Sequence, residues 1–368
     1  MKNRIIILIL ISLGINQTVE LISSEPMFVN GINTMLYTFG IESQDIEMRQ
    51  VFVNSYHQDN SNGAVVLNTG GMGTSFYSSY GQNGINTITT LYNAGYEIYE
   101  LRWLGSHGWA TNSRGFGYHN AVGAYSELIE YLHANYFDNP GRVFANGNSG
   151  GAVQIAYGLA KYSLEEIMTM VILSGGPPTS DLRNGIFCDG TNPICWPDDL
   201  EGFIFTDYLM GWNGNGDYCY YREAPEYIKV QLDPVSLVID LDNRDYHYST
   251  FVNFVQSDDE TNADHQAELY YNEITSEKDW HFLSSIIEHA VPATYLGAQK
   301  IQELIINFQE SIIGDTNSDG IIDILDISLI VNYILGFESE IQNADMNNDG
   351  LVNITDIVIL INLILVIE

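Results

Sequence analysis

The 368-residue sequence predicts an α/β fold, a mostly parallel sheet with helices on both faces, followed by a small all-α domain. Apolar runs typical of buried strands, such as 64–67 and 168–173, alternate with helical segments such as 121–135, and this alternation predicts the parallel sheet. The smaller domain is predicted by a 12-residue acidic pattern that starts at Asp315 and again at Asp345. An apolar helical segment follows each copy.

Composition limits the classes of partner. Apolar residues make up 45% of the chain, enough for a large core. The formal net charge is -34, which argues against nucleic acid and against an anionic membrane surface. Such a charge suits a salty medium or a protein that binds cations.

The N-terminus has the pattern of a secretory signal peptide, which we assign to residues 1–20. Lys2 and Arg4 precede the apolar run 5–11, and the small-residue pattern 12–14 can serve as a cleavage site. The run is too short to span a membrane, so we expect no span in the mature chain. We therefore expect a secreted, extracellular protein, free or attached to the cell surface.

Three cysteines, Cys188, Cys195 and Cys219, lie in one loop-rich region. In an exported protein they predict one disulfide and one remaining thiol. The sequence leaves all three pairings open.

The predicted sheet begins with two strands inside 31–58, followed by the buried strand 64–67. A glycine cluster, 70–73, comes directly after that strand. The next strand is 97–103. The loop 104–118 contains Trp109 and either lines the substrate site or packs as an aromatic surface loop.

The nucleophile is predicted at Ser149. The residues from Gly147 to Gly151 read G-x-S-x-G, after the buried strand that begins at Val143 and before the helical segment 152–160. This strand-turn-helix context is the one that a nucleophile elbow requires, since the turn exposes the serine hydroxyl at the edge of a sheet. The helix N-terminus beneath it favours developing negative charge.

The elbow makes this part of the chain resemble the α/β-hydrolases, and the resemblance covers about residues 60–305. It implies an oxyanion hole made by the backbone N–H of Gly150 and by one N–H from the glycine cluster, either Gly71 or Met72. Residues 179–249 interrupt the strand-helix alternation, and we expect them to form a lid over the site.

The other two members of the triad are expected after the last strands. An acid after strand 251–255 would orient the base, and we assign Asp259, with Asp258 as the alternative, because Gln256 stands where such folds often have glycine. His289 follows strand 281–283 and is the expected base. The order Ser149, Asp259, His289 is the order this fold uses, and no metal is expected in catalysis.

The repeated acidic pattern of residues 311–368 predicts two calcium loops of the EF-hand type, each with oxygen ligands at positions 1, 3, 5, 9 and 12, and with glycine at position 6. Position 7 would contribute a backbone carbonyl. The tail resembles a dockerin domain, and this resemblance implies docking onto a cohesin domain of a scaffold or surface protein. The expected ligands of two structural calcium ions are Asp315, Asn317, Asp319, Ile321, Asp323, Asp326, Asp345, Asn347, Asp349, Leu351, Asn353 and Asp356.

The sequence therefore predicts a secreted serine hydrolase, residues 21–310, with a dockerin-like module at 311–368. Dockerins imply polysaccharide breakdown, so an esterase acting on acylated polysaccharide or a related small ester is the expected activity. The alternatives are a peptidase of the same fold and a non-catalytic surface or scaffold component.

Overall fold

The computed structural model describes residues 18–367 with internal gaps, and residue contacts divide the chain into two compact units, Met1–Ile306 and Asn307–Glu368. The gaps are 44–45, 189–191, 197–199, 239–245, 259–260, 309–313, 318–321, 338–340, 342 and 348–349.

In the described part of the larger unit, nine strands form one sheet in the order β1-β2-β3-β5-β4-β6-β7-β8-β9. The pairs β1–β2, β2–β3 and β3–β5 are antiparallel, and every pair from β5 to β9 is parallel. The strands are β1 (Thr18–Val29), β2 (Ile32–Ser43), β3 (Ile46–Tyr56), β4 (Ala64–Asn68), β5 (Glu97–Trp103), β6 (Val143–Asn148), β7 (Met170–Ser174), β8 (Phe251–Ser257) and β9 (Lys278–Leu283). The predicted mostly parallel sheet is confirmed.

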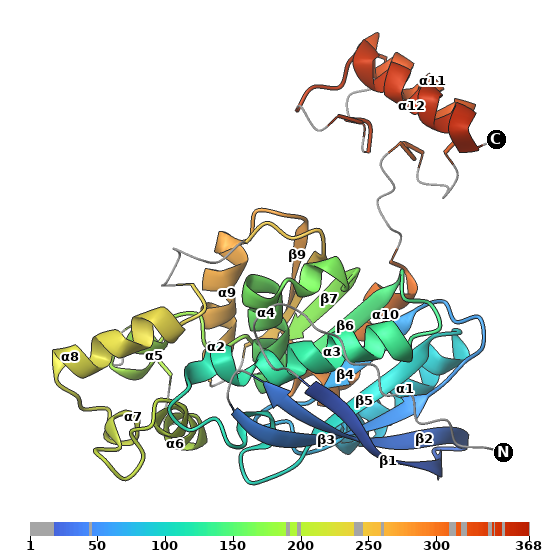
Figure 1. Ribbon diagram of the computed structural model, residues 1–368. Coiled ribbons are helices and arrows are strands. Elements are labelled where there is room, and N and C mark those ends of the chain that lie inside the picture. Colours follow the sequence, from blue (N-terminus) through green and yellow to red (C-terminus); the bar gives the residue numbers. More distant parts are fainter. Residues whose placement is uncertain are drawn as a thin grey trace. The chain divides into compact units, whose positions relative to one another are not determined.

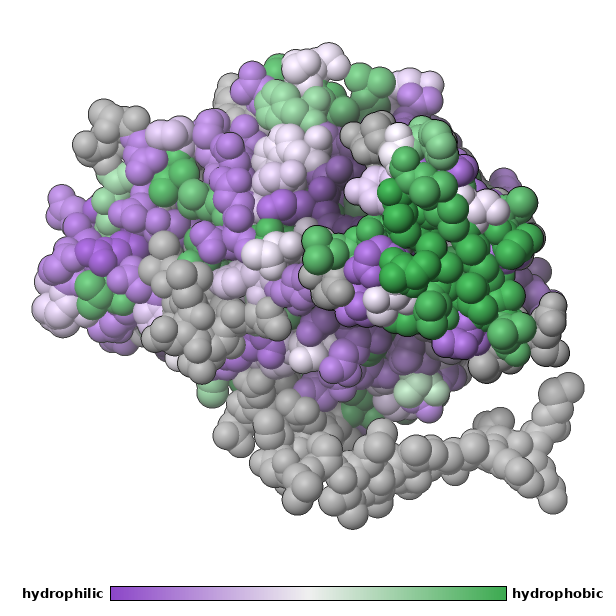
Figure 2. Space-filling model, turned by 90° about the horizontal axis from the view of Figure 1, so that it is seen from above, coloured by the Kyte–Doolittle hydropathy of each residue, from purple (hydrophilic) through white to green (hydrophobic). Residues whose placement is uncertain are grey.

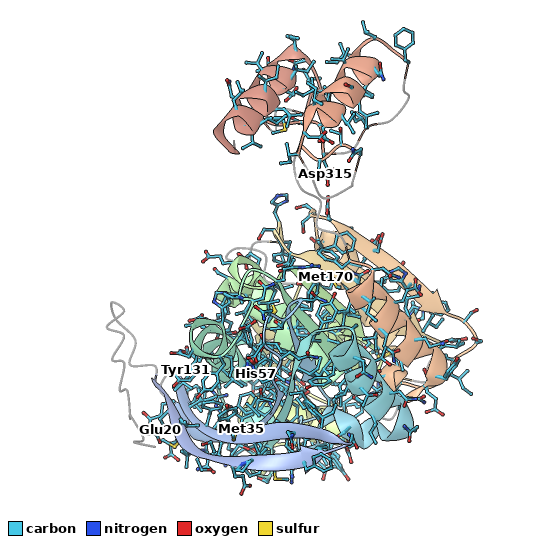
Figure 3. The ribbon with its side chains drawn as sticks, turned by 90° about the vertical axis from the view of Figure 1, so that its right-hand side faces the viewer. Glu20, Met35, His57, Tyr131, Met170 and Asp315 are labelled. Carbon is cyan, nitrogen blue, oxygen red and sulfur yellow. A yellow bond between two sulfur atoms is a disulfide. The ribbon has the colours of Figure 1, made fainter. Side chains whose placement is uncertain are left out.

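The structure differs from the prediction at the N-terminal edge, where three antiparallel strands replace the expected two. β1 and β2 are 12 residues each and form a long pair along the edge of the sheet, marked by Glu20 and Met35 in Figure 3. β1 has exposed side chains along most of its length, so it lacks the buried pattern that would reveal a strand in sequence. Residues 18–20 belong to β1, while residues 1–17 lie outside the described residues, and the cleavage position stays a prediction.

Helices cover both faces of the sheet (Figure 1). α3 and α4 pack against each other, and so do α1 and α10. Alternate side chains of β4 point to opposite faces of the sheet. Ala64 and Val66 belong to the core cluster that contains residues of α3 and α4, whereas the equally buried Val65 does not. The helices are α1 (Gly81–Asn93), α2 (Gly117–Ala121), α3 (Gly123–Asn135), α4 (Gly150–Tyr162), α9 (Ala263–Glu273) and α10 (Tyr295–Ile306), with short 3-10 turns at η1 (Tyr77–Tyr80), η2 (Gly108–Ala110), η3 (Leu164–Glu166) and η6 (Val291–Ala293).

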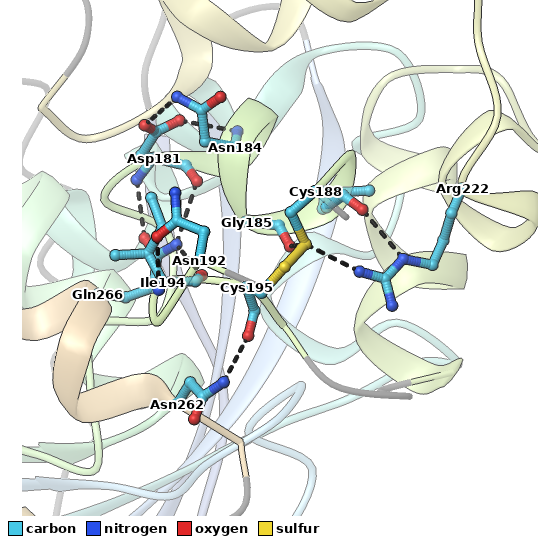
Figure 4. The surroundings of a disulfide bond; sticks show 11 residues. Asp181, Asn184, Gly185, Cys188, Asn192, Ile194, Cys195, Arg222, Asn262 and Gln266 are labelled. Atoms are coloured by element: carbon cyan, nitrogen blue, oxygen red, sulfur yellow. Dashed lines mark hydrogen bonds between the residues drawn. A yellow bond between two sulfur atoms is a disulfide. The ribbon is translucent and has the colours of Figure 1, made fainter. Parts of the chain in front are cut away.

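The described residues of the insertion 179–249 form the short helices α5 (Leu182–Ile186), α6 (Leu200–Leu209), α7 (Tyr218–Tyr221), α8 (Glu226–Lys229) and η4 (Val230–Val235). It packs on the core through aromatic contacts such as Phe205 against Trp109, with ring centroids 5.2 Å apart. Its disulfide joins Cys188 to Cys195, which settles the pairing, and Cys219 is buried outside the bond (Figure 4). The expected single disulfide with one remaining thiol is confirmed.

The smaller unit contains α11 (Ile324–Ile334) and α12 (Ile354–Ile367) around a small core that includes Ile330 and Leu360. Both helices start inside the 12-residue acidic pattern, at its tenth position, rather than after it as expected. The first start is fixed by a capping box, in which Asp323 accepts from Leu325 N and Asp326 accepts from Asp323 N. The predicted helical, duplicated domain is confirmed.

Helix length and hydropathy bear on the membrane question. Within the residues that the structure describes, no helix has both the length and the apolar character needed to cross a membrane.

Candidate active site

Ser149 occupies the tight turn between β6 and α4. Its φ of 50° and ψ of -111° are unusual for a residue with a side chain, and its N–H donates to the carbonyl oxygen of Ser174 over 2.9 Å. A strained turn of this kind holds the serine hydroxyl clear of the sheet. Ser149 therefore lies at a strand-to-helix turn with the backbone of such an elbow, and its role as the nucleophile stays a prediction.

The glycines of the motif are required by close approach. A Cβ on Gly147 would overlap the backbone of Gly151, and a Cβ on Gly151 would lie 2.8 Å from the carbonyl oxygen of Thr69. A Cβ on Gly150 would overlap the backbone of Gly71. The elbow and the glycine cluster after β4 are thus in direct contact, as adjacent parallel strands allow.

The glycine cluster presents few amides that could hold an oxyanion. Gly70 N–H donates to the Tyr80 hydroxyl over 2.9 Å, and Gly73 N–H donates to the Gly70 carbonyl oxygen over 3.1 Å. Burial raises the pKa of Tyr80 to about 12, only partly offset by the Gly70 bond, so this hydroxyl stays protonated. Gly71 and Met72 remain as the candidate donors, and their role in an oxyanion hole stays a prediction.

Gly71 fits that role better than Met72. The Gly71 backbone lies against Gly150, whose N–H is at the first turn of α4 and lacks an intrahelical acceptor. The carbonyl oxygens of both candidate residues accept from Trp109, that of Gly71 from Nε1 over 3.0 Å and that of Met72 from the backbone N–H over 3.1 Å, so the contact with Gly150 is what distinguishes Gly71. Of the two roles expected for the loop 104–118, the structure shows packing for Trp109, because this side chain is buried.

His289 lies in the loop between β9 and η6, beside the loop that follows β7. A Cβ on Gly175 would lie 2.5 Å from the carbonyl oxygen of His289, and a Cβ on Gly176 would lie 3.5 Å from the Cα of Ser149. The same glycine pair thus contacts both the His289 and the Ser149 backbone. His289 Nδ1 lies 3.0 Å from the Thr261 hydroxyl.

The loop expected to supply the acid runs next to the His289 loop. Ser257 Oγ, at the end of β8, donates to the carbonyl oxygen of Glu288 over 3.0 Å. Asp259 lies outside the described residues. Asp258 is exposed, and within the described part of the chain no contact joins it to His289. Asp259 therefore remains a prediction.

A pocket of about 260 Å³ brings these parts together. Met72 is absent from its described lining, and so is every described residue of the insertion, so the lid role of 179–249 stays a prediction. The residues that line it are Thr69, Gly70, Gly71, Thr74, Ser75, Ser79, Tyr80, Asn148, Ser149, His289 and Ala290.

Sequence reasoning missed Tyr80, which fixes Gly70, and Thr261, which touches His289. Tyr80 follows the glycine cluster by several residues, and only the η1 turn returns its ring to the site. No sequence signal would single out Thr261, because its contact joins residues 28 apart.

The two acidic loops of the smaller unit are built alike. Asp326 and Asp356 are fully buried, and each accepts from a backbone N–H ten residues earlier, of Thr316 and Met346 respectively, over 2.8 Å. Within the described residues no three His, Cys, Asp or Glu side chains gather as a metal site, but the expected ligands Asp319, Ile321 and Asp349 lie outside them. The donor set that remains consists of oxygens, which suits calcium.

Comparison with known proteins agrees with this architecture. Residues 313–365 match the family described as "Dockerin type I domain". These residues form a dockerin domain. Domains of this family bind calcium and interact with cohesins.

The larger unit has the α/β-hydrolase fold. Acetyl xylan esterase 1 from Thermoanaerobacterium sp. JW/SL YS485 is 13% identical, with a TM-score of 0.50, and the match covers 80% of this chain and 88% of that one. EstE1, a carboxylesterase cloned from a metagenomic library, is 11% identical over 78% and 88%, with a TM-score of 0.48. An esterase from Pyrobaculum calidifontis is 14% identical over 78% and 86%, with a TM-score of 0.46. No curated protein sequence matches this chain.

Proposed function

We propose that this chain is a secreted serine hydrolase that cleaves carboxylic esters. The observation that carries the proposal is that Ser149, held at positive φ beside the first turn of α4, lines one pocket with His289 and Gly71. A strained serine, an imidazole and backbone amides in one hollow are the parts that acyl transfer requires.

In the proposed reaction, the Ser149 hydroxyl attacks the ester carbonyl carbon while His289 accepts its proton. The N–H groups of Gly71 and Gly150 donate to the oxyanion, and His289 returns the proton to the leaving alcohol. Water then hydrolyses the acyl-serine, with His289 again as the base. Asp259 would keep Nδ1 of His289 protonated and stabilise the imidazolium.

The substrate class follows from the attached domain. Dockerins are carried by enzymes of polysaccharide breakdown, which favours esters on a polysaccharide over free lipids or peptides. Localisation outside the cell agrees with the disulfide Cys188–Cys195.

The dockerin domain would hold one calcium ion in each loop and attach the enzyme to a cohesin of a scaffold or surface protein. Apolar side chains are exposed over its two helices (Figure 2), and they suit a protein partner. These include Ile324, Leu325, Leu335, Phe337, Leu351, Ile354 and Val358.

The test is active-site labelling. A fluorophosphonate should label the wild-type chain at Ser149, and Ser149→Ala should lose both the label and the hydrolysis of a short p-nitrophenyl ester while keeping its thermal unfolding. Ser163→Ala is the matched control, because Ser163 also has positive φ but caps the other end of α4. A Ser149→Ala variant with wild-type turnover would remove the nucleophile assignment. Peptide hydrolysis without ester hydrolysis would favour a peptidase, and no labelling at all would favour a non-catalytic component.

A further inference from the structure

A second hollow, of about 460 Å³, adjoins the pocket at Ser149. The two share Thr74, Ser75 and Ser79 in their linings, so a ligand bound at Ser149 can extend into the second hollow. Its volume falls in the range of ligand sites, on the order of 300–1,000 Å³. It is therefore the adjoining subsite for whatever part of the substrate lies beyond the ester.

Arg102, on β5, is the only charged side chain among the described residues that line this hollow. The remaining lining combines the apolar side chains of Val29, Phe76 and Ile85 with neutral polar residues, among them Asn30 from the β1–β2 turn and Ser78 from η1. A single cation among neutral hydrogen-bonding groups is a site for an anionic, hydroxyl-rich ligand.

The guanidinium group of Arg102 is held in place from several sides. Its Nε donates to the carbonyl oxygen of Thr74 over 3.1 Å, and its Cζ lies 5.8 Å from the ring centroid of Phe52 and 5.7 Å from that of Phe76. Ring faces and one backbone bond fix the plane of the group. Such a preorganised fork loses little conformational freedom when it binds an anion.

No carboxylate neutralises this cation within the described part of the chain. The chain has 47 acidic and 13 basic residues, and Arg183, for comparison, pairs with both Glu226 and Asp233. Glu100, two residues before Arg102 on β5, has its carboxylate occupied by the Tyr56 hydroxyl at 2.6 Å and Ser78 N at 3.0 Å. An unneutralised arginine in the hollow that adjoins the Ser149 pocket, in so acidic a protein, points to a negative charge brought by the substrate.

We propose that Arg102 is the specificity-determining residue of a subsite for an anionic sugar, and that the substrate is an ester on an acidic polysaccharide. The inference rests on the proposed function. Arg102 would form a charge-assisted, two-pronged hydrogen bond to a carboxylate or sulfate on the sugar next to the acylated one, and Asn30 and Ser78 would bind its hydroxyl groups.

Esterase kinetics of the full chain test this subsite. Acetylated oligogalacturonate should be a better substrate than acetylated xylo-oligosaccharide of equal length, and about 0.5 M NaCl should reduce the difference. Arg102→Gln should lower kcat/KM on the acidic ester roughly tenfold to hundredfold, mainly through KM, and leave the neutral ester within about twofold. An acetylated sulfated saccharide distinguishes a sulfate site from a carboxylate site. Equal losses on acidic and neutral esters would overturn the proposal, because they would mean that Arg102 only packs the loop.

Two controls keep the result decisive. Arg142→Gln removes an arginine that also lies over a ring, Phe144 at 5.5 Å, but precedes β6 at the opposite end of the strand from Ser149, and it should not change the preference. Arg102→Lys keeps the charge and should retain part of the preference. If Arg102→Gln does not fold, the preference of the wild type for the acidic ester and the reduction of that preference by salt still test the proposal. The absence of both would overturn it.

Failure of the esterase assignment is detected separately. Calorimetric binding of unesterified oligogalacturonate to Ser149→Ala needs no catalysis, and Arg102→Gln in that background should abolish it. Binding of oligogalacturonate to Ser149→Ala, together with no ester turnover by the wild-type chain, would retain the subsite and reject the esterase. Ester turnover by the wild type without a preference for the acidic ester, and without binding of oligogalacturonate to Ser149→Ala, would retain the esterase and reject the subsite.

Discussion

The indole N–H of Trp109 donates to the carbonyl oxygen of Gly71 over 3.0 Å, and the backbone N–H of the same tryptophan donates to Met72. The two bonds tie the glycine cluster after β4 to the buried η2 turn. In the larger unit, the backbone that follows the Gly71 N–H, the Gly71–Met72 peptide, is therefore held by a residue from a different loop. This dependence leads to the first prediction.

Trp109→Phe should lower kcat for a short ester about tenfold with little change in KM. The loss is smaller than for a deleted oxyanion donor, on the order of 10²–10³, because the backbone next to the Gly71 N–H is loosened while the donor itself stays in place. The free energy of unfolding should fall by about 0.5–1.5 kcal/mol for the lost hydrogen bond. Steady-state kinetics and urea unfolding measure the two effects.

Trp103→Phe is the matched control for this variant. Trp103 is as buried as Trp109 and contacts the same Gly73, but its indole nitrogen has no hydrogen-bond partner within the described residues. The Trp103→Phe variant should therefore have the kcat of the wild type. Equal losses of kcat in the two variants would show that aromatic volume, and not the bond to Gly71, supports the site.

Asp259→Asn should reduce kcat far more than Asp258→Asn, because only a carboxylate placed at His289 Nδ1 stabilises the imidazolium. Asp258 is exposed, so its loss should have little effect. Thr261→Val removes the hydroxyl 3.0 Å from Nδ1 and should shift the pH–rate profile without abolishing turnover. If Asp258→Asn is the more damaging change, the acid has been assigned to the wrong residue.

Removing the disulfide with Cys188→Ser and Cys195→Ser should destabilise the larger unit by about 2–3 kcal/mol, the entropy of a short closed loop. Asn262 Nδ2 donates to Cys195 O over 2.7 Å, and Gln266 Nε2 donates to Ile194 O over 2.9 Å (Figure 4). Since Asn262 follows Thr261 directly, kcat should fall as well. Guanidinium unfolding and ester kinetics provide the measurements.

Reductant serves as the internal control for the disulfide. It should lower wild-type stability to that of the double variant and leave the double variant unchanged, while Cys219→Ala should respond to reductant as the wild type does. A double variant with unchanged stability and unchanged kcat would show that the loop does not brace the Thr261 segment.

Calcium removal should unfold the dockerin domain and leave esterase activity intact. From residue 311 onward the chain has no Lys or Arg, so its carboxylates repel one another unless a cation binds. With EDTA, the full chain should lose the helical signal of α11 and α12 and the binding of a cohesin, and titration should return two calcium ions. A single ion, helices that persist in EDTA, or a parallel loss of ester turnover would contradict this division of roles.

Local patterns made most of the fold and several site residues predictable. The runs at β4 and β7 are buried and almost entirely apolar, as is typical of parallel strands covered on both faces. The Ser149 motif needs only its two flanking elements to be interpreted. β1 was missed because an exposed edge strand has no buried face to leave a pattern. Arg102 was missed because a lone arginine in a strand carries no local signal for what it faces.

The sequence by itself determined most of the elements, the strand-turn-helix motif at Ser149, the two acidic loops and the presence of one disulfide, because each depends on residues close together in the chain. Only the tertiary structure decided which cysteines pair, which amide of the glycine cluster lies against Gly150, and that Arg102 stands beside the pocket. The physical reason is the parallel sheet. It aligns the carboxyl ends of β4, β6, β7 and β8 at one edge, so loops far apart in sequence come into contact there.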